Sequence, residues 1–333
     1  MFDEHYQIAQ IYDKEQDRMI MKPGTIGNCI KAFEDIPQAY DAWEITNYYT
    51  EKGWVMDDVT SVIPYVSGAR VGFTVTRTFD RSSLTQTITL DETTKEIRFD
   101  TEIDWKNDHL LVKTYFPLDI NTKTATYDIQ FGAFERPTHK NTSWDAARFE
   151  VCAQKFADLS EKGYGVALMN DCKYGYSAEG STISLTMLKS ATHPDPKADK
   201  CHHEFTYSLL PHVGDYRDAG VIEASYLLND PLVAMTIGET EGVLPEEYSL
   251  LSVSGTGTII ETIKQAEDGD DTIVRLHDAY NMHAKRTLSF AKPIKAAWVC
   301  NMLERPIAEL PVEGNQLEID VHPYEILTLK CQF

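Results

Sequence analysis

The sequence lacks the features that mark a membrane protein or a disulfide-stabilised one. No stretch approaches the ~20 consecutive apolar residues of a membrane-spanning helix, and no basic segment followed by an apolar run marks a secretory signal. The six cysteines include no Cys-x-x-Cys pair, which argues against a structural zinc site and a dense disulfide framework. We therefore expect a cytoplasmic protein, with no membrane partner, whose cysteines are buried free thiols.

Motifs for nucleotide chemistry are also missing. Gly163-Tyr164-Gly165 and Gly255-Thr256-Gly257 do not continue as a GxGxxG or a Walker sequence that opens a helix, so we expect turn glycines at both places. No Gly-x-Ser-x-Gly elbow and no set of kinase motifs appears. The sequence therefore gives no support for a phosphate loop, a serine hydrolase or a kinase.

Basic residues are scarce relative to acidic ones. The chain has 52 Asp and Glu residues but only 31 Lys and Arg residues, so its formal net charge is −21 at pH 7. The acidic residues are spread along the chain rather than gathered into a tail. Such a surface repels phosphate backbones, so nucleic acid is not an expected partner, whereas a neutral sugar is indifferent to the net charge.

The feature that is present throughout is a period of two in hydrophobicity. Apolar residues alternate with polar ones at positions 97–105, 71–76, 125–131 and 183–187. This alternation predicts antiparallel strands with one buried face, and few ten-residue helical patterns lie between them. The segment Trp144–Lys155 fits a short helix and a strand equally well. We predict an all-β architecture of stacked antiparallel sheets.

The pattern of strands breaks once, in an acidic segment with Gly and Pro at Glu239–Glu247. A new series of strands follows it and ends near the C-terminus. We therefore predict a domain boundary near residue 242, with one domain at residues 1–241 and a smaller one at 242–333.

Polar and aromatic residues gather in turns between the apolar runs of Phe131–Tyr174. Carboxylates beside aromatic rings are the groups with which proteins hold sugar rings, so these turns predict a ligand-facing rim. Asp41 and Trp43 offer the same chemistry earlier in the chain. A core tryptophan beside a satisfied aspartate, or ion pairs within turns, would produce the same residue types. The turn residues in question are Arg136, His139, Trp144, Asp145, Asn170 and Asp171.

The run His193, Asp195, Asp199, His202 and His203 is the densest gathering of His and Asp, and it raises the alternative of a metal site. Two prolines, Pro194 and Pro196, instead favour a rigid extended loop. We assign no metal ligand in this chain.

Several long blocks in fixed order resemble one family over nearly the whole chain. They are IYDKE at 11–15, GNCIKAFEDIPQAYDAWEI at 27–45, the stretch 131–174, THPDPKAD at 192–199, FTYSLLPHVGD at 205–215 and KQAEDGDD at 264–271. These blocks resemble the C-terminal β-sandwich region of family 38 glycoside hydrolases, the metal-dependent retaining α-mannosidases. The family usually has aspartate where this chain has Glu44.

The resemblance implies a large antiparallel β-sandwich of the super-sandwich, galactose-mutarotase-like type, followed by a smaller C-terminal β-sandwich. It places the nucleophile and the His/Asp ligands of a divalent metal, zinc or similar, in an N-terminal catalytic domain. No matching motif precedes Phe131, so we expect the non-catalytic part of an α-mannosidase, inactive alone, with no catalytic residue and no cofactor of its own. The expected partners are that catalytic domain and a mannose-containing oligosaccharide, with self-association into a homo-oligomer as a further option.

The resemblance also makes the loop at 192–199 a candidate to reach a neighbouring domain's cleft. The substrate-binding candidates are therefore Asp41, Trp43, Arg136, His139, Trp144, Asp145, Asn170, Asp171 and Asp195. A free-standing carbohydrate-binding β-sandwich remains the alternative, because its fold and rim would look much the same. A mutarotase-like sandwich enzyme using His and Glu is a third possibility, with no residue match to accompany it.

Overall fold

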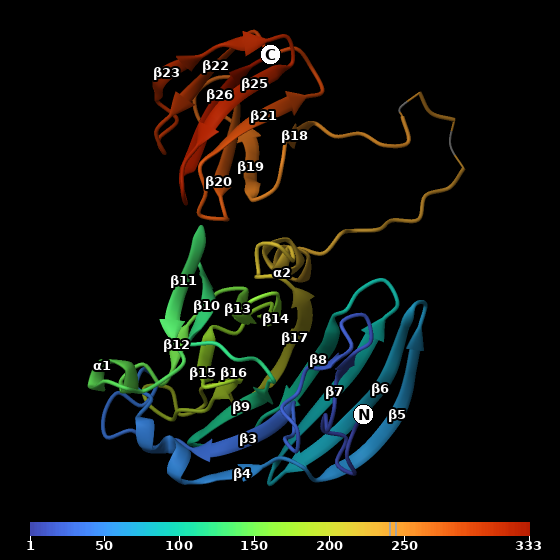
Figure 1. Cartoon of the computed structure of the whole chain (residues 1–333), viewed down its shortest axis with the longest axis vertical. Helices are drawn as coiled ribbons and strands as arrows, with labels where there is room; N and C mark the ends of the chain where they lie inside the picture. The colour runs from blue at the N-terminus through green and yellow to red at the C-terminus, as the bar shows by residue number, and fades with distance from the viewer. Residues whose placement is uncertain (240, 244) are drawn as a thin grey trace. The chain divides into compact units, whose positions relative to one another are not determined.

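The computed structural model describes residues 1–239, 241–243 and 245–333 of the chain. The chain divides into two compact units, the first comprising Met1–Ile129 and Phe134–Leu232 and the second Gln130–Ala133 and Val233–Phe333. Antiparallel β-sheets build both units (Figure 1). The predicted all-β fold, with a large sandwich followed by a smaller one, is therefore confirmed.

Two sheets and a short hairpin form the first unit. The hairpin pairs β1 (Tyr12–Asp13) with β2 (Arg18–Met19). The nine-stranded sheet has the order β11 (Gly132–Pro137), β10 (Thr124–Ile129), β13 (Phe156–Glu161), β14 (Tyr164–Asn170), β17 (His202–Val213), β8 (Ile97–Asp104), β7 (Ser82–Asp91), β6 (Arg70–Phe79) and β5 (Val59–Ser67). The six-stranded sheet has the order β12 (Val151–Cys152), β15 (Gly175–Glu179), β16 (Thr182–Lys189), β9 (Leu110–Pro117), β3 (Cys29–Glu34) and β4 (Gly53–Val55).

The main core lies between these two sheets. In β8, Ile97, Phe99 and Ile103 are buried, and the charged residues between them are partly or fully exposed. The ring of Phe99 lies 4.8 Å from that of Tyr207 in its own sheet and 5.7 Å from that of Phe116 in the six-stranded sheet, measured between centroids. The apolar residues that alternate in the sequence thus form the buried face of the strand. All four predicted strands are confirmed, as β8, β6, β10 and β16.

The other face of the six-stranded sheet is covered by loops. On β9 it carries Leu111, Lys113 and Tyr115, whose neighbours Val112 and Phe116 belong to the main core. The short 3-10 helix η1 (Asn47–Glu51) packs here, and its Tyr49 joins Phe33 and Leu111 in a second apolar cluster. The segment containing helix α1 (Ser143–Ala146) covers the face from the other side, with the ring of Phe149 at 6.3 Å from that of Tyr49.

A second α-helix, α2 (Val221–Asn229), packs on β14 and was not expected from the sequence. Val221, Ile222 and Ser225 are its buried residues, and the amide of Asn229 donates a hydrogen bond to the carbonyl oxygen of Asn170. Its N-cap is Gly220 at φ 66°, which supplies no side-chain cap. The usual N-terminal signal was therefore missing.

The second unit pairs two smaller sheets around its own core, which includes Val274, Leu276, Leu288, Leu317 and Leu329. The four-stranded sheet has the order β18 (Leu251–Val253), β21 (Ala284–Phe290), β25 (Gln316–Val321) and β24 (Val312–Glu313). The five-stranded sheet has the order β19 (Thr258–Gln265), β20 (Thr272–Asp278), β26 (Ile326–Gln332), β22 (Ala296–Cys300) and β23 (Pro306–Leu310).

Residues 230–250 form no helix or strand at their described positions. Thr240 and Leu244, inside the predicted linker, lie outside the described residues. The two units divide between Leu232 and Val233, and the boundary near residue 242 stays a prediction. No helix in the described part of the chain is long and apolar enough to cross a bilayer.

Three local expectations need correction or completion. Cys152, Cys172 and Cys201 are exposed, so the expectation of buried thiols is wrong for them, and holds for Cys300 and Cys331. Gly165 is not a turn glycine, because it lies inside β14. The segment 144–155, whose sequence fits a helix and a strand equally well, contains both. Helix α1 ends near its start, and strand β12 follows.

Candidate functional site

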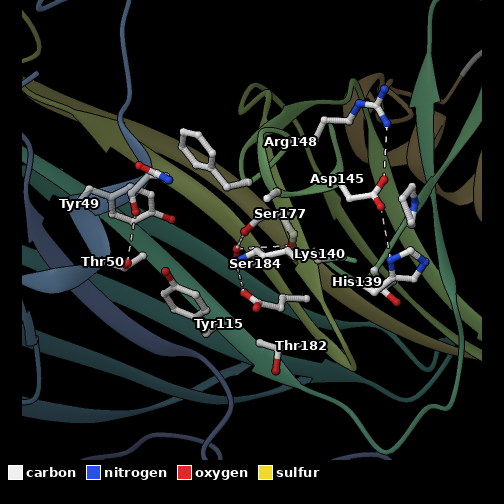
Figure 2. Close-up of a pocket in the computed structure, with 17 residues that line it drawn as sticks. Tyr49, Thr50, Tyr115, His139, Lys140, Asp145, Arg148, Ser177, Thr182 and Ser184 are labelled. Carbon is white, nitrogen blue, oxygen red and sulfur yellow. Dashed lines mark hydrogen bonds and ion pairs between the residues drawn. The ribbon is translucent and has the colours of Figure 1, made fainter. Parts of the chain in front are cut away.

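A pocket of about 410 Å³ opens on the loop-covered face of the six-stranded sheet (Figure 2). All of its lining residues belong to the first unit. Three strands supply the floor, η1 supplies one wall, and the segment from Pro137 to Phe149 supplies the other. The volume falls in the usual range for small-molecule sites, about 300–1,000 Å³.

The floor of the pocket is polar because of strand alternation. Tyr176, Ile183 and Leu185 point into the main core, so the intervening Ser177 and Ser184 face the pocket. The two serine hydroxyls lie 2.6 Å apart. Tyr115 of β9 extends the floor as an aromatic surface. The floor therefore offers hydroxyl groups beside a ring.

The wall formed by residues 137–149 holds the charged groups. Thr142 caps α1, because its hydroxyl accepts from the backbone N–H of Asp145 at 3.1 Å and donates to the Asp145 carboxylate at 2.8 Å. This fixes Asp145 between His139, whose Nδ1 lies at 3.7 Å, and Arg148, whose guanidinium lies at 4.0 Å. In Figure 2 the carboxylate lies between these two cationic or potentially cationic groups.

A buried ion pair lies beside the pocket, on the same face of the sheet. Lys113 is fully buried, and its ammonium contacts the carboxylate of Glu150. It also lies 3.2 Å from the hydroxyl of Tyr49 and 3.0 Å from that of Ser177. Burial lowers the pKa of Lys113 to about 7, in a direction that the nearby carboxylate opposes. Sequence reasoning missed this cluster, although a lysine inside the apolar run LLVKTYF was a visible signal.

Glu150 itself is held from several sides. Its Oε1 accepts from Tyr49 at 3.0 Å, and its Oε2 accepts from the hydroxyl of Thr186 at 3.2 Å. Burial raises the pKa of Tyr49, so its hydroxyl stays protonated and available as a donor. The cluster thereby ties η1, β9, β15 and β16 together beside the pocket.

The structure brings only some of the predicted site residues to this pocket. His139 and Asp145 line it. Trp144, their neighbour on α1, is 76% exposed and is not part of the lining. Arg136 stacks on the rings of Tyr127 and Phe134 at 4.7 and 5.2 Å, and burial lowers its pKa.

Asp41 organises a neighbouring loop. Its carboxylate accepts from the backbone N–H groups of Thr192 at 2.8 Å and His193 at 3.2 Å. Burial alone would raise the pKa of Asp41. The hydrogen bond from Thr192, together with the nearby His109 and Lys189, outweighs this effect and lowers the pKa. Asp195 lies on the loop held in this way and caps the backbone N–H of Lys197. Trp43 is 70% exposed, so it is not a core tryptophan.

Asn170 and Asp171 lie away from the pocket lining and make internal bonds. Asn170 is 1% exposed, and its amide donates to Tyr176 and to the carbonyl oxygen of Gln154. Asp171 accepts from the backbone N–H of Thr206 on β17. Neither residue lines the pocket. A role for Asn170 or Asp171 in binding stays a prediction.

The histidine-rich run does not form a metal centre in the described part of the chain, where no three His, Cys, Asp or Glu side chains gather to hold an ion. His202 instead contacts Glu204 at 2.9 Å. His203 lies 2.7 Å from the carbonyl oxygen of Asp199 and 3.6 Å from the sulfur of Cys201.

Comparison with known proteins identifies relatives for both units. Residues 2–197 match the family described as "Glycosyl hydrolases family 38 C-terminal domain", and residues 257–329 match "Glycosyl hydrolases family 38 C-terminal beta sandwich domain". The chain is 39% identical over 320 residues to alpha-mannosidase 2C1 of Homo sapiens, covering 94% of this chain and 31% of that protein. It is 35% identical over 341 residues to alpha-mannosidase G of Dictyostelium discoideum, covering 97% of this chain and 31% of that protein.

A solved structure shares the fold. The crystal structure of an alpha-mannosidase from Enterococcus faecalis V583 superposes with a TM-score of 0.81 over 99% of this chain and 40% of that one, at 17% identity. The chain thus spans less than half of each of these proteins.

Proposed function

Because the chain belongs to family 38 of the glycosyl hydrolases and corresponds to the C-terminal region of that family, we propose that it is the non-catalytic part of an α-mannosidase. In this proposal the whole protein is a retaining, metal-dependent enzyme that hydrolyses terminal α-mannosides. The observation that carries the proposal is that 94% of the chain matches an alpha-mannosidase at 39% identity, while residues 2–197 match the C-terminal domain of the family.

The proposed role of this part is to support the catalytic domain and to line the site where the sugar binds. The pocket on the six-stranded sheet supports the second role, because it combines aromatic rings, hydroxyl groups and a carboxylate. We assign the nucleophile and the divalent metal, zinc or a similar ion, to the catalytic domain. The cytoplasmic location, the oligosaccharide partner and self-association stay predictions.

A free-standing carbohydrate-binding module is the second candidate. It is favoured by one observation, that the first unit alone supplies every residue of the pocket. Such a module would bind a sugar without contributing to a hydrolase.

An exchange experiment tests the main proposal. The matching C-terminal part of human alpha-mannosidase 2C1 is replaced by this chain, and hydrolysis of an aryl α-mannoside is compared with that of the human protein lacking the part altogether. We expect the chimera to be active and the deleted protein to be inactive or poorly folded. A chimera no more active than the deleted protein would overturn the proposed supporting role.

The chain alone supplies the second arm. With zinc, calcium or cobalt added, we expect it to release no nitrophenol from the same substrate, because we assign the chemistry to the catalytic domain. Turnover that disappears on substitution of a single carboxylate within this chain would show that it carries its own active site, contrary to the proposal.

A further inference from the structure

The positive and negative side chains that line the pocket nearly balance, which restricts the classes of ligand that it can bind. Asp145 lies between His139 and Arg148, and Lys140 is paired with Glu179 at 2.8 Å. An anion would find each cationic side chain already opposed by a carboxylate, and a purely apolar ligand would bury these groups unpaired. A neutral ring that carries hydroxyl groups satisfies both constraints.

Aromatic side chains supply the complementary surface for such a ring. Tyr115 lies in the floor, and Tyr49 and Phe149 lie on the two walls. The C–H faces of a pyranose pack on aromatic rings while its hydroxyls reach polar neighbours. The residue types of floor and walls are therefore those that a sugar ring requires.

The ammonium group of Lys113 sets the direction of the hydrogen bonds that run from it through Ser177 to Ser184 in the floor. A charged lysine only donates, so the Ser177 hydroxyl must accept from Lys113. The proton of Ser177 is then free to donate to Ser184 at 2.6 Å. Among the described residues, the acceptor for the Ser184 proton is the carbonyl oxygen of Ser177. This oxygen is 3.5 Å away, at the outer limit for a hydrogen bond. Ser184 is only 1% exposed but lines the pocket, so its hydroxyl is left as a donor for a group that reaches the floor.

We propose that this pocket binds one neutral pyranose ring and that Lys113, acting through Ser177, makes Ser184 the hydrogen-bond donor at its floor. The choice of a sugar rests on the function proposed above. Lys113 is in this account a positioning residue, because it touches Ser177 and Glu150 and not the ligand.

The charge state of Lys113 gives the proposal a signature in pH. A neutral amine has a lone pair and accepts from Ser177, which reverses these hydrogen bonds and turns the Ser184 hydroxyl away from the ligand. Loss of the proton in the range near pH 7, toward which burial shifts the pKa of Lys113, would weaken sugar binding. The charged or titratable groups that face this cluster or the pocket are Glu150, Tyr49, Tyr115, Lys31, Lys140, Glu179, His139, Asp145 and Arg148.

The test measures binding of methyl α-D-mannopyranoside to the whole 333-residue chain by ligand-observed NMR titration, with cyclohexanol as a ring of similar size that lacks the hydroxyl pattern. We expect saturable binding of the glycoside and none of cyclohexanol. Ser184→Ala should weaken binding by about threefold to tenfold, the effect of one hydrogen bond. Ser208→Ala is the matched control, because Ser208 is also buried on a strand and its hydroxyl has no partner among the described residues.

The pH arm compares the same variants below and above pH 7. We expect the affinity of the unmodified chain and of Ser208→Ala to fall as the pH rises, and that of Ser184→Ala to stay flat. A fall of equal size in Ser184→Ala would assign the titration to another group, such as His139, and would overturn the role given to Lys113. These variants leave the Lys113–Glu150 pair in place, so the fold is not put at risk.

The outcomes separate this inference from the proposed function. Failure of the glycoside to bind, or equal binding by the unmodified chain and Ser184→Ala, would overturn the pocket inference, whereas an active chimera would still support the α-mannosidase proposal. Binding with the expected pattern but an inactive chimera would leave the pocket standing and favour the free-standing module.

Discussion

The ammonium of Lys113 contacts the carboxylate of Glu150 beside the pocket, in a place where the lysine has no exposed surface. The two residues come from β9 and from the segment that covers it, 37 positions apart in the sequence. Two charges removed from water are tolerated here because Tyr49, Ser177 and Thr186 complete their hydrogen bonds.

Substitution of Lys113 by methionine should therefore strongly destabilise the first unit. The change leaves Glu150 as an uncompensated buried charge, and breaking such a pair costs about 3–5 kcal/mol. Urea unfolding of the whole chain measures the cost. The control is Lys285→Met, which removes an exposed partner of Asp320 at 3.7 Å and should cost less than about 1 kcal/mol. Equal costs for the two variants would show that the buried pair has no special role.

The architecture could be predicted from the sequence because it depends on local alternation. In β8 and β16 the period of two is visible in the residues themselves, and the core forms on the face that the period defines. Helix α2 could not be predicted in the same way, since Gly220 at its start supplies no capping side chain.

The candidate site divides along similar lines. His139 and Asp145 could be found because they lie close together in one polar turn. Lys113 stands out in an apolar run, but its burial could not be predicted, because alternation on β9 places it on the face that a lone sheet would expose to water. Its burial comes from Tyr49 and Glu150, whose positions depend on long-range packing that no local pattern encodes.

Asp41 should hold the loop at residues 192–199 in a pH-dependent way. Its folded-state pKa is lowered, so its stabilising effect is complete above the unfolded-state value near 4 and is lost as the pH falls through the folded-state value. Hydrogen exchange should show falling protection of the Thr192 and His193 amides as the pH drops below about 4. Asp41→Asn should loosen the loop already at neutral pH, whereas Asp195→Asn, on the same loop but not bonded to these amides, should not. Unchanged protection in Asp41→Asn would contradict this role.

Gly165 should not tolerate even a methyl group. A Cβ added there would lie 2.3 Å from the hydroxyl oxygen of Ser160 and 2.4 Å from Cε1 of His212, a residue whose Nε2 lies 2.7 Å from Asp158 in a buried pair. Gly165→Ala should therefore destabilise the chain by about 3 kcal/mol, at the upper end for overpacking. Gly238→Ala is the control, because nothing lies within 4 Å of its added Cβ, and its effect should stay within about 0.5 kcal/mol. Similar unfolding midpoints for both variants would contradict the close packing of β14 against β17.

Substitution of tryptophans should have different effects on stability in the core and at the predicted rim. Trp105 is 1% exposed and stacks on Phe79 with ring centroids 6.4 Å apart, so Trp105→Ala should cost about 3–5 kcal/mol in the urea unfolding of the whole chain. Trp43→Ala and Trp144→Ala remove exposed rings and should change stability by less than about 0.5 kcal/mol.

If the rim prediction is correct, these two exposed tryptophans contribute to sugar binding rather than to stability. Trp43→Ala and Trp144→Ala should then weaken binding of an α-linked mannose oligosaccharide, whose further rings extend beyond a single-ring pocket, and leave the unfolding midpoint unchanged. Trp298→Ala, in the second unit, is the control for loss of an indole elsewhere. If neither rim substitution affects oligosaccharide binding, sugar recognition is limited to the pocket on the six-stranded sheet. An aromatic side chain that contributes to neither stability nor binding is not part of the binding site.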